Sequence, residues 1–219
     1  MKKIYCISGL GADHRLFGKL SIPGYELIPM PWLPFDTNDD MVSYASKMAT
    51  LINDKAAIII GLSFGGMLAT EIAKTHPDYK AFLVSSAKIA SEIKIHGGAV
   101  SKWLIRSMIV PPSLLNIPSF TTLRYLGAIT KEEKTLLSLF IRDSDGRFMK
   151  WALKAIATWK NKIIPPNVIH IHGTADKTIP SAGVHPDYWI EGGSHIMIYN
   201  RASDIGRIIS DCLRSDGKN

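Results

Sequence analysis

The chain has 219 residues, of which 46% are hydrophobic and 21% charged, and its formal net charge is +7. This composition is typical of a folded globular protein and excludes a disordered chain. Cys6 and Cys212 are the two cysteines. They cannot build a disulfide framework, and no Cys/His cluster has zinc spacing. The N-terminal apolar stretch is too short for a signal peptide, and no uncharged run is long enough to span a membrane. We therefore expect a cytoplasmic protein without integral membrane association.

Both ends of the chain alternate apolar runs with segments of helical periodicity. Strands are predicted over Lys3–Ser8, Tyr25–Met30, Ala56–Leu62, Ala81–Ser86, Val168–His172 and Tyr188–Ile190. Amphipathic helices are predicted over Met41–Ile52, Phe64–His76 and Asp204–Leu213. Strands that alternate with helices indicate an α/β fold with a mostly parallel sheet and helices on both of its faces.

Residues 88–162 interrupt this alternation and carry half of the 26 Lys and Arg residues of the chain. They hold 13 Lys and Arg against 5 Asp and Glu. Helices are predicted over Ser101–Ile109, Lys131–Phe140 and Asp145–Trp159, with a broken apolar loop over Pro111–Pro118. We interpret the segment as a helical insertion into a core made of residues 1–87 and 163–219. Its cations belong either to solvated helix faces or to a site for an anionic substrate.

The clearest chemical motif is Gly61-Leu62-Ser63-Phe64-Gly65, which fits the pattern Gly-x-Ser-x-Gly. An apolar strand precedes the motif and an amphipathic helix follows it. A serine on such a tight strand-to-helix turn adopts strained backbone angles, so its neighbours must lack a Cβ atom. The turn predicts Ser63 as a nucleophile held at the start of a helix.

A serine nucleophile needs a base, and the base needs a carboxylate that fixes its tautomer. His195 is the best candidate base, because it stands in a Gly-rich loop after the last predicted strand. His14, in the loop after the first strand, is its rival. Asp176 follows the predicted strand Val168–His172 and is the candidate carboxylate. The chain order Ser63, Asp176, His195 is the one expected for a triad whose serine lies on such a strand-to-helix turn.

A tetrahedral oxyanion needs two N–H donors. The backbone N–H of Phe64, directly after the nucleophile, is expected to be one of these donors. The second is expected from the loop after the first strand, where Leu10 follows Gly9.

Together these landmarks resemble the α/β-hydrolase fold, in particular a small bacterial serine hydrolase with a helical cap. The resemblance covers nearly the whole chain outside residues 88–162, which stand where the family inserts its cap. The usual His-Gly before the oxyanion loop is Ser8-Gly9 here, which leaves the backbone donors in place. The N-terminal strand pair of larger members is missing, so the resemblance implies a sheet of about six strands.

The resulting expectation is a serine hydrolase that cleaves a carboxylic ester or thioester through an acyl-enzyme, with no metal or organic cofactor. The substrate is a small molecule, and nucleic acid is not expected as a partner. His14, Trp103 and Trp151 are candidates for the substrate pocket. Carbon–carbon bond hydrolysis on the same triad and a non-catalytic ligand-binding protein of the same fold are the alternatives. Nucleotide binding is disfavoured, because the loop at Gly9 only half matches the dinucleotide fingerprint.

Overall fold

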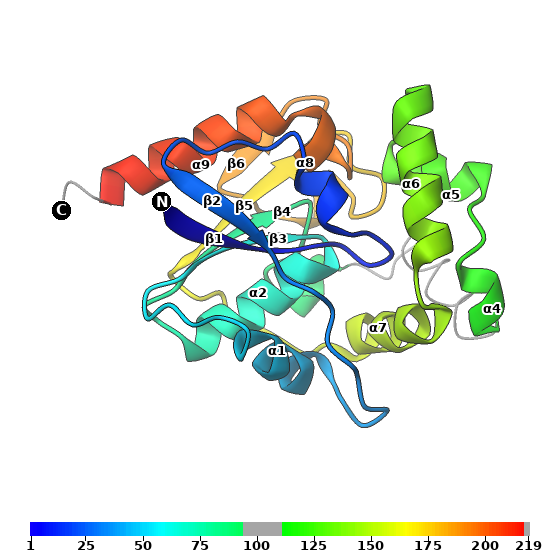
Figure 1. Cartoon of the computed structure of the whole chain (residues 1–219), viewed down its shortest axis with the longest axis horizontal. Helices are drawn as coiled ribbons and strands as arrows, with labels where there is room; N and C mark the ends of the chain where they lie inside the picture. Colours follow the sequence, from blue (N-terminus) through cyan, green and yellow to red (C-terminus); the bar gives the residue numbers. More distant parts are fainter. Residues whose placement is uncertain (94–110, 217–219) are drawn as a thin grey trace.

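The computed structural model describes residues 1–93 and 111–216 and is built on one six-stranded sheet (Figure 1). All neighbouring strands run parallel, in the order β2-β1-β3-β4-β5-β6. The strands are β1 (Lys2–Ile7), β2 (Tyr25–Pro29), β3 (Ile58–Leu62), β4 (Lys80–Val84), β5 (Val168–Gly173) and β6 (Tyr188–Ile190). The predicted α/β class and strand number are confirmed.

Helices cover both faces of the sheet (Figure 1). Helices α1 (Met41–Ala49) and α2 (Phe64–Thr75) lie on one face and α9 (Ala202–Asp216) on the other. Successive residues of a strand point to opposite faces. In β3, Ile59 therefore joins the core with α1 and α2, whereas Ile60 joins the core with α9. Both isoleucines are fully buried, which explains why this central strand is apolar throughout.

The described part of the chain between β4 and β5 holds four α-helices: α4 (Pro112–Leu115), α5 (Phe120–Leu126), α6 (Lys131–Asp143) and α7 (Gly146–Thr158). Helix α6 begins with the predicted capping box of Thr130 and Glu133. The predicted loop over Pro111–Pro118 is wrong in part, because it contains α4; a proline is compatible with the first turn of a helix. Helix α5 was not predicted, and the predicted helix over Ser101–Ile109 lies outside the described residues.

The chain leaves β4 and returns to β5 at adjacent points. The Ala90 N–H donates to the Asn161 carbonyl over 2.9 Å, and the Asn161 side-chain amide donates to the Lys88 carbonyl over 2.8 Å. The remaining short elements are η1 (His14–Phe17), η2 (Ala90–Glu92), η3 (Ser181–Gly183) and α8 (Met197–Asn200). Among residues 1–93 and 111–216, no helix is long and apolar enough to cross a membrane.

Candidate active site

Ser63 sits on a strained turn between β3 and α2. Its φ of 52° and ψ of −116° lie in a region that side-chain-bearing residues seldom occupy. A Cβ at Gly61 would lie 2.5 Å from the Gly65 carbonyl oxygen, and one at Gly65 would overlap the carbonyl oxygens of Ile7 and Ser8. The glycines of the motif are therefore required by close backbone approach, as the sequence predicted.

Ser63, His195 and Asp176 form one continuous hydrogen-bonded chain. His195 Nε2 lies 2.9 Å from Ser63 Oγ, and His195 Nδ1 lies 2.8 Å from Asp176 Oδ2. His195 and Asp176 are only 5% and 4% exposed. A neutral imidazole with its proton on Nδ1 can donate to the carboxylate and accept the serine proton on Nε2.

The second oxygen of Asp176 is held by the backbone. Its Oδ1 accepts the N–H of Thr178 over 2.8 Å and the N–H of Ile179 over 2.9 Å. With both donors on Oδ1, the other oxygen faces His195. The turn after β5 thus fixes the rotation of the carboxylate as well as its position.

The loop after β1 passes next to the nucleophile. A Cβ at Gly9 would lie 3.4 Å from the Ser63 Cβ. The loop is closed by a hydrogen bond from the Ala12 N–H to the Gly9 carbonyl and by one from Ser8 Oγ to the Ala12 carbonyl. Leu10, one of the two expected oxyanion donors, directly follows Gly9 in this loop.

His14 is the first residue of the short helix η1, which follows this loop. Its side chain is 66% exposed, and its Nδ1 is 3.9 Å from a carboxylate oxygen of Asp13. The hydrogen bond to Ser63 Oγ therefore comes from His195, the preferred candidate base. Trp103, the second pocket candidate, lies outside the described residues.

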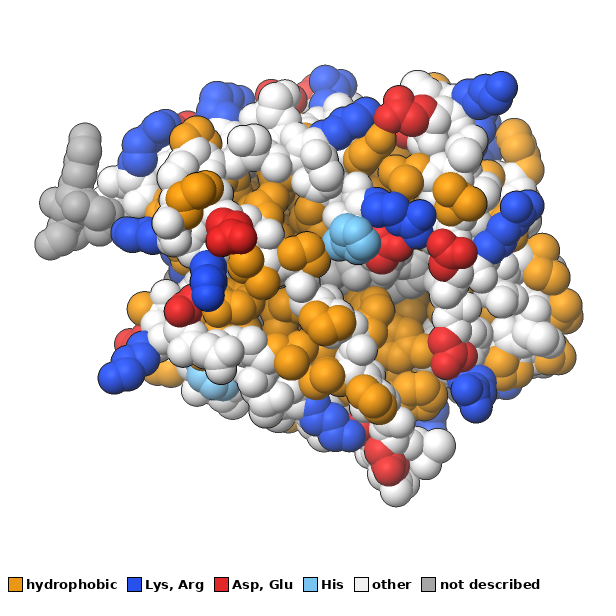
Figure 2. Space-filling view, viewed as in Figure 1, with side chains coloured by type: hydrophobic (Ala, Val, Ile, Leu, Met, Phe, Trp, Pro, Cys, Tyr) orange, Lys and Arg blue, Asp and Glu red, His pale blue; other side chains and the backbone are white. Residues whose placement is uncertain are grey.

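Trp151, the third pocket candidate, belongs to an aromatic cluster beside the nucleophile. The cluster joins the loop after β2, helix α1, the start of α2 and helix α7, through Trp32, Phe35, Tyr44, Phe64, Phe148 and Trp151. The Trp151 indole N–H donates to the Asp39 carbonyl over 2.9 Å. Figure 2 shows this face of the molecule hollowed between the sheet and the helices α6 and α7, with hydrophobic side chains around the hollow.

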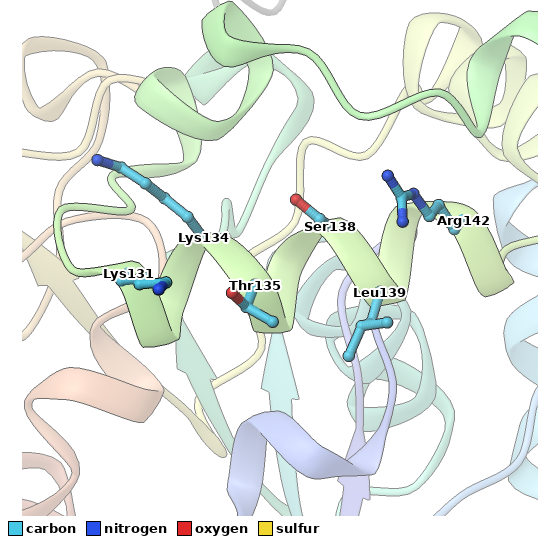
Figure 3. A pocket seen from close by; sticks show the side chains of 6 residues that line it. All are labelled: Lys131, Lys134, Thr135, Ser138, Leu139 and Arg142. Atoms are coloured by element: carbon cyan, nitrogen blue, oxygen red, sulfur yellow. The ribbon is translucent and has the colours of Figure 1, made fainter.

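A second hollow, of about 470 Å³, lies on the outer face of α6 (Figure 3). Its described lining residues are Lys131, Lys134, Thr135, Ser138, Leu139 and Arg142. Three of the six are cations, so an anion would find a favourable potential there.

Sequence analysis missed two histidines next to the candidate acid. His170 and His172 lie in β5 and are both fully buried, on the same face of the strand because they are two residues apart. His172 Nε2 is 3.7 Å from Asp176 Oδ2, and His170 Nε2 is 3.1 Å from His172 Nδ1. Burial lowers the pKa of His172 and places that of His170 well below its usual range. The signal was present as a His-x-His pair in an otherwise apolar strand.

Because His170 and His172 are buried, we expect the protein to lose stability as the pH falls. An unfolded histidine takes up a proton near pH 6.5, whereas the buried rings stay neutral below that pH, so the unfolded state binds more protons. A histidine that stays neutral in the fold lowers the free energy of unfolding by up to about 1.4 kcal/mol per pH unit below pH 6.5. His170→Gln keeps a donor to His172 and should reduce this slope by about that amount in urea denaturation. An unchanged slope between pH 6.5 and 5 would contradict the assignment.

Comparison with known proteins places the fold. No protein-family model and no curated protein matches the chain. A thermophilic esterase superposes with a TM-score of 0.72 at 16% identity, covering 98% of this chain and 90% of the esterase. The N-acyl homoserine lactonase AidH gives 0.69 at 13% identity, with 98% and 89% covered. A bromoperoxidase from Bacillus anthracis gives 0.70 at 13% identity, with 97% and 92% covered.

These similarities, with the strand order and the turn at Ser63, define the class of the chain: it has the α/β-hydrolase fold. The resemblance noted in the sequence is confirmed at the level of the fold. Esterase, lactonase and bromoperoxidase share that fold, so the reaction must be argued from the site of this chain.

Proposed function

We propose that the protein is a serine hydrolase that cleaves a small carboxylic ester or thioester through an acyl-enzyme. The observation that carries the proposal is the hydrogen-bonded chain from Ser63 Oγ through His195 to Asp176. Its distances of 2.9 and 2.8 Å are those that proton transfer and tautomer selection need.

In the proposed reaction, Ser63 Oγ attacks the acyl carbon while His195 Nε2 takes the serine proton. The N–H groups of Leu10 and Phe64 hold the oxyanion of the tetrahedral intermediate. The intermediate then expels the alcohol or thiol, which receives the proton from His195. Water, activated by His195 in the same way, attacks the acyl-enzyme and releases the carboxylic acid. Asp176 stays ionised throughout and stabilises the imidazolium.

The choice of base gives a direct test. His195→Ala removes the group that takes the serine proton, so kcat for a p-nitrophenyl ester should fall by about 10⁶-fold, as it does when the histidine of a serine protease triad is removed. His14→Ala changes an exposed side chain and should alter kcat less than about tenfold. Steady-state turnover of both variants checks the assignment. A larger loss in His14→Ala than in His195→Ala would show that the base is wrongly chosen.

We propose further that residues 88–162 form a cap over the site and that the aromatic cluster contributes to the acyl pocket. Helix α7 packs Phe148 against Phe64, the residue after the nucleophile, at a ring distance of 6.4 Å. The Arg15 guanidinium joins the loop after β1 to the end of α6, since it binds both Asp13 and Asp143. The insertion is thus connected to both sides of the proposed oxyanion hole.

The cations of the cap suggest an anionic substrate, such as an acyl-CoA. A cationic wall raises the local concentration of an anion, and salt screens the effect beyond roughly 8 Å at physiological ionic strength. We expect kcat/KM for the anionic thioester to fall about tenfold between low and high salt, while that of a neutral ester of equal acyl length stays nearly constant. Paired kinetic measurements across the salt range check this.

Charge reversal at the α6 hollow tests whether its cations attract an anionic substrate or are only solvated surface residues. Lys134→Glu with Arg142→Glu should abolish the salt dependence for the anionic substrate. The matched control is Lys2→Glu with Lys3→Glu, which changes two exposed cations at the opposite, N-terminal end of β1. Parallel salt curves for both substrates, unaltered by the reversal on α6, would leave these cations as solvated surface.

A carbon–carbon bond hydrolase and a non-catalytic binding protein are the other readings of the same geometry. Turnover of a β-diketone in place of an ester would favour the first. Binding without any turnover, with Ser63 unreactive, would favour the second.

A further inference from the structure

The buried histidine pair of β5 is hydrogen-bonded to the same turn that holds the candidate acid. His172 Nε2 lies 2.9 Å from the carbonyl oxygen of Ile179. The N–H of that same residue donates to Asp176 Oδ1 over 2.9 Å. Ile179 is thus held on both sides of its Cα, by the carboxylate at its N–H and by the imidazole at its carbonyl.

The hydrogen bonds define the protonation state of the pair. A carbonyl oxygen can only accept, so the His172 proton is on Nε2. His172 Nδ1 is then an acceptor, and it receives the Nε2–H of His170 over 3.1 Å. Both rings are neutral in this arrangement. Because the Asp176 Oδ2 that faces His195 is only 3.7 Å from His172 Nε2, a turn of the His172 ring would disturb the acid directly.

The surroundings keep the pair in place. Trp189 of β6 meets the His172 ring edge to face at 6.0 Å. Asp187 accepts the backbone N–H of His170 and lies 3.7 Å from the Lys88 ammonium. The titratable groups that act on the two rings are Asp176 from the turn after β5, His195 from the loop after β6, and Lys88 and Glu92 from the segment after β4. Asp187, before β6, contacts the pair through the His170 backbone N–H.

We propose that His172 is a positioning residue of the triad. By holding the Ile179 carbonyl, it fixes the turn whose two N–H groups occupy Asp176 Oδ1, and so directs Oδ2 toward His195. A carboxylate can rotate about its Cβ–Cγ bond, and a small misplacement of an orienting group is costly in catalysis. The inference rests on the proposed function, since it assigns His172 a part in the same reaction.

Two substitutions at His172 separate positioning from packing. His172→Phe keeps the ring volume in a fully buried site and removes both nitrogens. His172→Gln retains an amide N–H that can reach the Ile179 carbonyl. The matched control is His76→Phe, because His76 also contacts a backbone carbonyl, that of Ile72, but at the end of α2 away from the triad.

The readouts are kcat and KM for a p-nitrophenyl ester and the far-downfield proton resonance of His195 Nδ1–H. We expect His172→Phe to lower kcat about 10²-fold with little change in KM and to shift or broaden the resonance. His172→Gln should recover most of kcat and the wild-type resonance, and His76→Phe should match wild type. A folded His172→Phe protein with wild-type kcat and resonance would overturn the proposal, as would a folded His172→Gln protein as impaired as His172→Phe.

Two further outcomes stay informative. Should His172→Phe fail to fold, His170→Leu takes its place: it removes the donor to His172 Nδ1, so a smaller fall in kcat and a broadened resonance are expected, and wild-type values would overturn the proposal. Should wild type hydrolyse no ester, the proposed function fails. The effect of His172→Phe on the His195 Nδ1–H resonance then still decides whether His172 positions Asp176 and His195.

Discussion

Ser63→Ala is expected to lower kcat for a p-nitrophenyl ester by about 10⁶-fold, as the loss of the nucleophile does in a serine protease. The change removes one oxygen, whose hydrogen-bond partner is His195 Nε2. Alanine tolerates the φ of 52° no worse than serine, since both carry a single Cβ. The fold should therefore be retained while the chemistry is lost.

Steady-state kinetics and thermal unfolding of the same preparation check this prediction. The free energy of unfolding should stay within about 1 kcal/mol of wild type. A folded Ser63→Ala protein that keeps its ester turnover would exclude the acyl-enzyme mechanism on this residue.

Gly65→Ala is expected to lower the free energy of unfolding by about 3 kcal/mol. The new Cβ would overlap the carbonyl oxygens of Ile7 and Ser8, which are backbone atoms at the end of β1 and cannot move aside as a side chain could. Folded domains have a total stability of about 5–15 kcal/mol, so a loss of this size would remove roughly 20–60% of it.

Gly9→Ala is the matched control. Its Cβ would make ordinary contacts of 3.4 Å with the Ser63 Cβ and 3.6 Å with the Leu62 Cγ. Urea denaturation of both variants should show a large loss for Gly65→Ala and a small one for Gly9→Ala. Equal losses would mean that the close approach of β1 to the start of α2 is not what requires glycine.

The sheet and the candidate triad could be predicted because they depend on local patterns and one topological rule. The apolar run of β3 shows a strand buried on both faces, and the glycines around Ser63 show a tight turn. The C-terminal ends of parallel strands meet at one edge, so a serine after β3 and an aspartate after β5 lie at the same edge of the sheet.

Contacts between distant side chains could not be predicted in this way. The periodicity of α7 shows that Phe148 and Trp151 share an apolar face, but it does not show that this face packs on Phe64 and Tyr44. The contact of His172 could not be predicted, because its partner, the Ile179 carbonyl, is a backbone group whose position depends on a turn. Helix α5 is only seven residues long, too short for a clear period.

The most direct test of the central claim is the covalent state of Ser63 after reaction with a p-nitrophenyl alkylphosphonate, read by intact mass and peptide mapping. The phosphonate resembles the tetrahedral intermediate and reacts with a serine only where a base activates it. We predict one phosphonyl group per chain, located on Ser63, in wild type, and none in Ser63→Ala or His195→Ala. Unmodified wild type, or a label on another residue, would contradict the proposed function.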